Sequence, residues 1–150
     1  MTGAERFALF LDSFASLDYR RKRAIFALLK GEADPFDRLA GMRAELCACA
    51  GEREAGALLS AARGGYADEI AERLNGRGIV PVACVSPAYP ALLKETGAPP
   101  LVLYARGDLS LLSSRCFAVV GSRKSLPSAR AKAAEFAEAL ILHGFTVVTG

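Results

Sequence analysis

Residues 117–124, with the sequence FAVVGSRK, limit the possible folds more than any other stretch of the chain. A run of apolar, mostly β-branched residues leads into Gly121, Ser122 and Arg123, and an alanine-rich amphipathic stretch begins at about Pro127. Short β-branched runs predict strands, and proline is favoured at the first position of a helix. The pattern predicts a buried strand, a tight loop and a helix, which together make half of a βαβ unit.

The residues after this loop extend the same unit. Up to His143 the apolar residues recur at helical spacing, and the expected apolar stripe is Ala133, Phe136, Ala137, Leu140 and Ile141. Gly144 ends the helix, and FTVV at 145–148 predicts a second strand, set parallel to the first by a right-handed crossover. Parallel sheets are almost always covered on both faces. We therefore expect this chain to be the front part of a longer protein, with its parallel sheet incomplete.

The loop between the predicted strand and helix carries the groups that bind an anion. The first N–H groups of a helix have no intrahelical partner, and the helix dipole adds positive potential there. Glycine allows a close backbone approach, and an arginine side chain can hold a phosphate with two donors. Residues 115–132 hold five basic side chains and no acidic one. Gly121, Ser122 and Arg123, with the adjacent Lys124, are the candidate phosphate-binding residues.

Other chemistry is not indicated around this loop. The loop lacks the further glycines of a G-x-G-x-x-G dinucleotide motif and is not a G-x-x-x-x-G-K-[ST] loop, so we predict no nucleotide hydrolysis. The sole histidine, His143, lies about 24 Å from Ser122 along the expected helix. The four cysteines form one C-x-C and two single positions, which favours small buried residues over a metal site. We expect no catalytic residue, no metal and no cofactor.

The first half of the chain has a different character. Residues 1–76 read as several short helices with glycine stops, at Gly31, Gly41, Gly51 and the pair Gly64 and Gly65. Strands are then predicted at 79–85 and 101–104. We predict two domains, a small helical domain over 1–76 and an α/β, incomplete Rossmann-like domain over 77–150.

Composition adds modest constraints. The chain is 52% hydrophobic and 23% charged, with a net charge of only +3, so local charge matters more than the total. No apolar run is long enough to span a membrane and no signal peptide opens the chain, which predicts a cytoplasmic protein. Four consecutive cations occupy 20–23. They are either an accessory nucleic-acid contact or, as we favour, an exposed basic turn.

Four ordered motifs resemble those of the DNA processing protein A family, DprA or Smf. They are Tyr89-Pro90-x-x-Leu93, then PPLVLY at 99–104 followed by Gly107, then VVGSR at 119–123, and finally GFTVVTG at 144–150. The resemblance covers about residues 78–150. It is more specific than the loop alone, and the helical first half adds little to it.

The resemblance implies an extended Rossmann-like domain that binds single-stranded DNA without known catalysis. Members of this family act in natural transformation, or competence, and load the RecA recombinase onto DNA. Gly121, Ser122 and Arg123 would then belong to the DNA-phosphate pocket, with Lys124 adding charge. The chain departs from the family pattern at Leu126, Ser128 and Ala129. A second glycine-rich motif of the family begins at 149–150, and a homodimer would form through later segments.

Two alternatives stay open. The same strand, loop and helix occur in an enzyme class on a related scaffold, the LOG-type phosphoribohydrolases, whose first loop also holds a phosphate. An interaction domain with no phosphate site would fit the pattern as well, because many strand-to-helix turns contain glycine and serine for purely conformational reasons.

Overall fold

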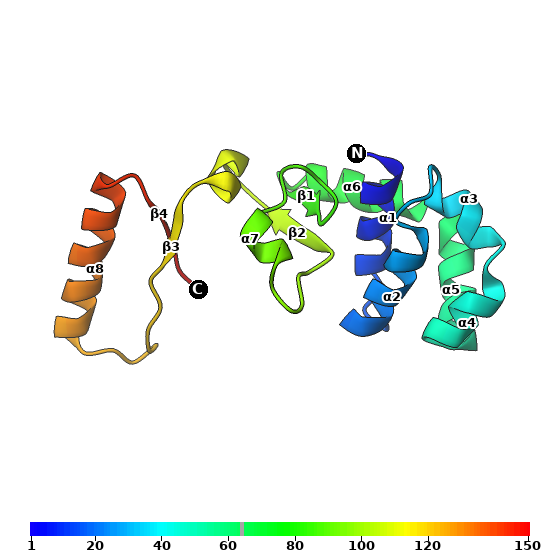
Figure 1. Ribbon diagram of the computed structural model, residues 1–150, viewed down its shortest axis with the longest axis horizontal. Coiled ribbons are helices and arrows are strands. Elements are labelled where there is room, and N and C mark those ends of the chain that lie inside the picture. The colour runs from blue at the N-terminus through cyan, green and yellow to red at the C-terminus, as the bar shows by residue number, and fades with distance from the viewer. Residues whose placement is uncertain (64) are drawn as a thin grey trace. The chain divides into compact units, whose positions relative to one another are not determined.

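The structure, a computed structural model, describes residues 1–63 and 65–150. It divides into two compact units, Met1–Gly107 and Asp108–Gly150 (Figure 1). The first unit contains the helical half of the chain together with an antiparallel hairpin, and the second contains a parallel strand pair and a long helix. The predicted break at Gly64 lies outside the described residues.

The described residues up to 76 form short helices joined by turns, as the glycine and capping patterns predict. The helices are α1 (Gly3–Asp12), α2 (Tyr19–Leu29), α3 (Pro35–Ala40), α4 (Arg43–Ala50), α5 (Glu52–Arg63) and α6 (Tyr66–Asn75). Asp18 caps α2 by accepting a hydrogen bond from the Arg21 N–H at 2.9 Å. Asp34 caps α3 in the same way, with Pro35 at the first helical position. These caps satisfy N–H groups that a helix leaves without an internal partner.

The core of the first unit is built around α1. Phe7 and Phe10 are fully buried, and their rings lie 5.5 and 5.4 Å from the ring of Phe36. Phe26 of α2 stacks on Phe7 with a centroid separation of 6.2 Å. Buried phenylalanine side chains each contribute about 1.5–3 kcal/mol of transfer free energy, so this aromatic group is a main source of the unit's stability.

A hairpin packs onto the same helices. Strand β1 (Val80–Ala83) pairs antiparallel with β2 (Val102–Ala105), and the short helix α7 (Ala91–Lys94) lies between them in the chain. Ala83 and Val102 belong to the same buried cluster as the helices, and β1 contacts both α1 and α6. The compact unit therefore extends to Gly107, whereas the predicted domain division falls after residue 76. That domain division stays a prediction.

The second unit contains the predicted strand, loop, helix and strand. After the 3₁₀ turn η1 (Leu109–Ser113) come β3 (Cys116–Ala118), α8 (Pro127–Leu142) and β4 (Thr146–Val148). The strands are parallel, with Phe117 opposite Val147, and α8 packs against β4 (Figure 1). The structure thus confirms a mixed α/β fold. A complete Rossmann-like arrangement stays a proposal.

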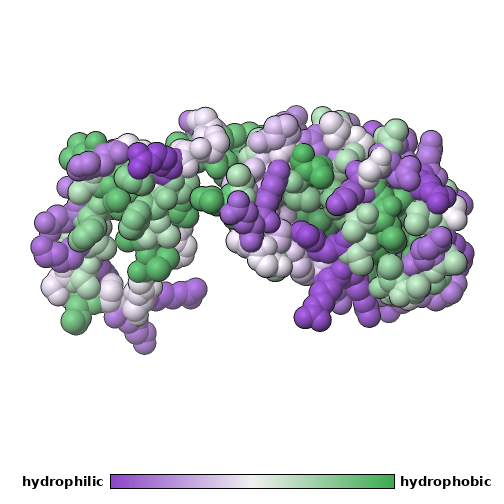
Figure 2. Space-filling view, in the orientation of Figure 1, coloured by the Kyte–Doolittle hydropathy of each residue, from purple (hydrophilic) through white to green (hydrophobic). Residues whose placement is uncertain are grey.

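The burial predicted for β3 is wrong in this structure. All three residues of β3 are exposed, and the Phe117 side chain is 47% exposed. Figure 2 shows apolar side chains at the surface of this unit. The physical reason is that a parallel strand is buried only when elements cover both faces of its sheet. Helix α8 packs against β4, and the exposure of β3 shows that the described residues do not cover both faces of this strand pair.

Candidate nucleic-acid interface

The predicted phosphate loop lies at the carboxyl edge of the parallel strand pair. Beyond the last residue of β3, the Val119 N–H still donates to the Val148 carbonyl at 2.9 Å. Residues 121–124 follow at this edge. Residues 149–150 follow β4 at the same edge, because the two strands are parallel. In open α/β sheets the carboxyl ends of the strands are the usual place for ligands.

The backbone of the loop makes a tight turn that leaves Gly121 open. The Ser122 Oγ accepts a hydrogen bond from the Lys124 N–H at 3.2 Å. Gly121 does not adopt a left-handed conformation, and a Cβ added there would meet no heavy atom within 4 Å. The surrounding structure therefore does not require a glycine at this position. An uncovered backbone is what a closely approaching ligand would use.

Two cations of the loop are free to act on a ligand. Arg123 and Lys124 are exposed, and no ion pair joins either of them to a carboxylate in residues 1–63 or 65–150. Arg130, one turn into α8, donates from Nε to the Ser125 Oγ at 3.2 Å. These three side chains concentrate positive charge around one loop, where an anion would be attracted.

The start of α8 adds backbone donors to this charge. Pro127 occupies the first helical position, and the preceding Leu126 supplies no side-chain cap. The first turn of α8 contains no acidic residue. Its first N–H groups therefore have neither an intrahelical partner nor a neighbouring carboxylate. Such helix starts bind phosphate groups readily.

The other two cations of the predicted basic stretch are engaged by other groups in the structure. Arg115 precedes β3 and so lies at the amino edge of the sheet, where its guanidinium sits 4.4 Å from the centre of the Phe145 ring. Lys132 forms an ion pair with Glu135 at 2.8 Å. Of the five basic residues in the stretch 115–132, three therefore remain at the candidate site: Arg123, Lys124 and Arg130.

The sole histidine lies at the opposite end of α8 from the loop. His143 is the C-terminal cap residue of this helix, and its Nδ1 is 2.8 Å from the Ala139 carbonyl oxygen. The 16 residues of α8 separate it from Ser122, as the sequence predicts. In the described residues no group of three histidine, cysteine or acidic side chains is arranged to hold a metal.

A shallow apolar cleft adjoins the loop and is absent from the sequence predictions. Its volume is about 330 Å³, and β3, the two residues after it and α8 line it, with Phe117, Val120 and Phe136 as its large apolar side chains. The sequence marks the same residues as apolar, and this pattern predicts that they are buried. The spacing of apolar residues in β3 and α8 does not predict an open cleft, because it does not show whether another element covers the strand.

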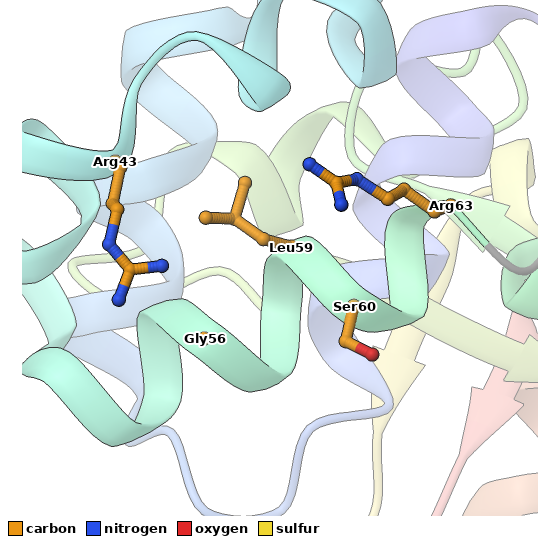
Figure 3. A pocket seen from close by; sticks show the side chains of 5 residues that line it. All are labelled: Arg43, Gly56, Leu59, Ser60 and Arg63. Atoms are coloured by element: carbon orange, nitrogen blue, oxygen red, sulfur yellow. The ribbon is translucent and has the colours of Figure 1, made fainter.

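The helical half holds a larger cavity that no motif indicates. It measures about 440 Å³ and lies at α4 and α5, where Arg43 and Arg63 flank Leu59 (Figure 3). Arg43 pairs with Glu52 at 2.5 Å, and this hydrogen bond lowers the pKa of the Glu52 carboxyl. One of the two cations is therefore already neutralised, which makes this cavity a weaker anion site than the loop.

The tyrosines of the family motifs pack within the first unit. Tyr89 is buried, and its hydroxyl donates to the Pro100 carbonyl at 2.8 Å. The Tyr104 hydroxyl donates to the Asp12 carboxylate at 2.7 Å. Both hydroxyl groups are thus used inside the unit, which fits packing residues better than base-stacking residues.

Comparison with known proteins bears on the second part of the chain. Residues 81–150 match the family model described as DNA recombination-mediator protein A. The matched segment begins within β1 and contains the hairpin, the loop and α8. No curated protein and no solved structure matches the chain. No helix in the described part of the chain is long and apolar enough to cross a membrane.

Proposed function

We propose that this chain, whose residues 81–150 match the family model of DNA recombination-mediator protein A, binds single-stranded DNA through its backbone phosphates. The family points to a role in DNA recombination and transformation. The finer proposal is that the chain acts in the cytoplasm, without catalysis, through a Rossmann-like domain. It would load the RecA recombinase onto the bound strand and form a homodimer.

One observation carries this proposal. Arg123 and Lys124 have no carboxylate partner in the described residues, and they stand beside an uncapped helix start at the carboxyl edge of a parallel strand pair. Phosphate contacts of this kind position a strand without reading its bases. Gly121, Ser122 and Arg123 would form the phosphate pocket, and Lys124 would add charge.

The test measures the affinity of the full chain for oligothymidine by fluorescence anisotropy at several salt concentrations. For each phosphate contact to a single strand, the logarithm of the binding constant falls by about 0.7 for each tenfold rise in salt concentration. Losing one such contact lowers the affinity about fivefold at 0.1 M salt. We expect Arg123→Ala to remove one such contact. Arg53→Ala, which removes an exposed cation of α5, is the charge-matched control. Equal binding by the Arg123→Ala variant and this control would refute the role of Arg123.

The LOG-type phosphoribohydrolase stays an alternative without a supporting observation. Such an enzyme needs acid–base groups near the bound phosphate. His143 lies at the far end of α8 from Ser122. The geometry of the described residues therefore favours binding over hydrolysis.

A further inference from the structure

A second basic cavity lies in the first unit, between α2 and the segment that connects β1 to β2. Its volume is about 250 Å³. Its lining consists of Arg23, Phe26, Ala27, Lys30, Cys84, Val85, Lys94 and Pro99. We call this cavity the basic pocket. Three of its lining residues are cations and none is acidic, and none of the three cations forms an ion pair within residues 1–63 and 65–150.

The basic pocket distinguishes Arg23 from its neighbours in the cluster of cations at 20–23. Arg21 pairs with Asp18 at 3.5 Å, and Lys22 lies 3.9 Å from an Asp12 carboxylate oxygen. Lys22 also donates to the Asp12 carbonyl at 2.6 Å. These two cations are compensated inside the protein. Arg23 has no such carboxylate partner and lines the pocket.

Arg23 is held in place by groups that leave its charge intact. Its guanidinium lies 5.8 Å from the centre of the Tyr19 ring, and one N–H donates to the Pro99 carbonyl at 3.4 Å. The Tyr19 hydroxyl donates to the same carbonyl at 3.0 Å. A guanidinium has five N–H donors, so most remain available. An oriented guanidinium loses little side-chain entropy when it binds a phosphate.

Lys94 provides a second oriented cation from the other side of the pocket. Its Nζ lies 5.7 Å from the centre of the Tyr89 ring, which is itself buried. Cys84 lines the same cavity as Arg23 and Lys94. Burial raises the pKa of the Cys84 thiol, while the positive charges of Arg23 and Lys94 both act to lower it. The two cations therefore act on the same small region of the pocket.

We propose that the basic pocket binds a backbone phosphate of a nucleic-acid strand, as a contact additional to residues 121–124. The inference rests on the proposed function, because it assigns a further site to the same class of ligand. Four of the eight lining residues lie in the segment that matches the DNA recombination family, which favours a nucleic acid over a phosphopeptide. The cavity has the volume of about eight waters at roughly 30 Å³ each, enough for a phosphate group with bound water.

The first test is the double variant Arg23→Gln with Lys94→Gln, assayed on the full chain with oligothymidine. If the two side chains share one phosphate, the salt slope falls by about 0.7 and affinity at 0.1 M salt falls about fivefold. The control is Arg53→Gln with Arg77→Gln, which removes two exposed cations outside the pocket. Equal affinities and slopes for the two double variants would overturn the proposal.

A second measurement uses the unmodified chain and so does not depend on the variants folding. Oligothymidine should shift the Val85 amide signal in a ¹⁵N–¹H spectrum, and a phosphoserine peptide at the same concentration should not. An unshifted Val85 amide at saturating oligothymidine would overturn the proposal. A shift caused by inorganic phosphate or the peptide but not by oligothymidine would also overturn it, since the pocket would then bind other anions.

The two proposals can fail separately. If Arg123→Ala weakens binding and the pocket variant does not, the loop stands and the basic pocket is rejected. If the pocket variant weakens binding and Arg123→Ala does not, the basic pocket stands and the role of Arg123 is rejected.

Discussion

Tyr104→Phe tests how the hairpin is held on the helices. The Tyr104 hydroxyl donates to an Asp12 carboxylate oxygen at 2.7 Å, and this bond joins β2 to α1 across 92 residues of chain. The substitution removes the hydroxyl and leaves the ring. We therefore expect the first unit to keep its fold and to lose part of its free energy of unfolding.

The size of this loss follows from the exposure of the pair. A hydrogen bond to a charged group contributes about 1.5–3 kcal/mol when it is well shielded. The Tyr104 side chain is 48% exposed and the Asp12 side chain is 25% exposed, so water competes for both groups. We expect a loss of about 1 kcal/mol. With a urea m-value of about 2 kcal/mol/M, the midpoint should fall by about 0.5 M.

Tyrosine fluorescence is a selective probe for this experiment. All four tyrosines lie in Met1–Gly107 and the chain has no tryptophan, so urea unfolding followed in this way reports on the first unit alone. Tyr66→Phe is the matched control. Its ring packs on Phe14 at 6.1 Å, and its hydroxyl, unlike those of the other three tyrosines, forms no hydrogen bond within the described residues. Indistinguishable midpoints for the two variants would refute the stabilising role of the bond.

Three further outcomes follow from the same structure. Burial and Asp12 raise the pKa of the Tyr104 hydroxyl, so the folded state holds this proton more tightly than the unfolded state. The free energy of unfolding should therefore fall as the pH rises above about 10, and it should fall less steeply in Tyr104→Phe. Urea midpoints between about pH 9 and 11 measure this difference. Gly121→Ala should leave the circular dichroism spectrum unchanged, because a Cβ there meets no atom within 4 Å, and should weaken oligothymidine binding in anisotropy titrations. Phe10→Ala should cost about 3–5 kcal/mol in urea unfolding, whereas Leu28→Ala, at a side chain 45% exposed, should cost less than about 1 kcal/mol.

Local patterns were sufficient for most of the secondary structure. The caps at Asp18 and Asp34, the proline at the start of α8 and the glycine after it all act within one turn of chain. The parallel pairing of β3 and β4 was also predictable, because a strand, helix and strand with short connections have few ways to close. The loop at 121–124 was found for the same reason, as its neighbours in sequence are its neighbours in space.

Ion pairing and burial could not be predicted in this way. The sequence shows four consecutive cations at 20–23, and Asp18 is a local partner of Arg21, but only the fold brings Asp12 close to Lys22 and places Arg23 at a cavity. Likewise, Arg115 belongs to the basic stretch in sequence but lies at the opposite edge of the sheet from the loop. Charge compensation depends on partners that periodicity does not identify.

The amino-acid order alone thus specifies the strand, the loop and the helix around Gly121 and Arg123, because glycine, proline and β-branched residues act on their own backbone. Tertiary contacts decide that the hairpin packs on α1, through the bond between Tyr104 and Asp12, and that β3 stays exposed. Burial and hydrogen bonding between distant segments are properties of the packed chain, since each requires a partner from elsewhere in the sequence.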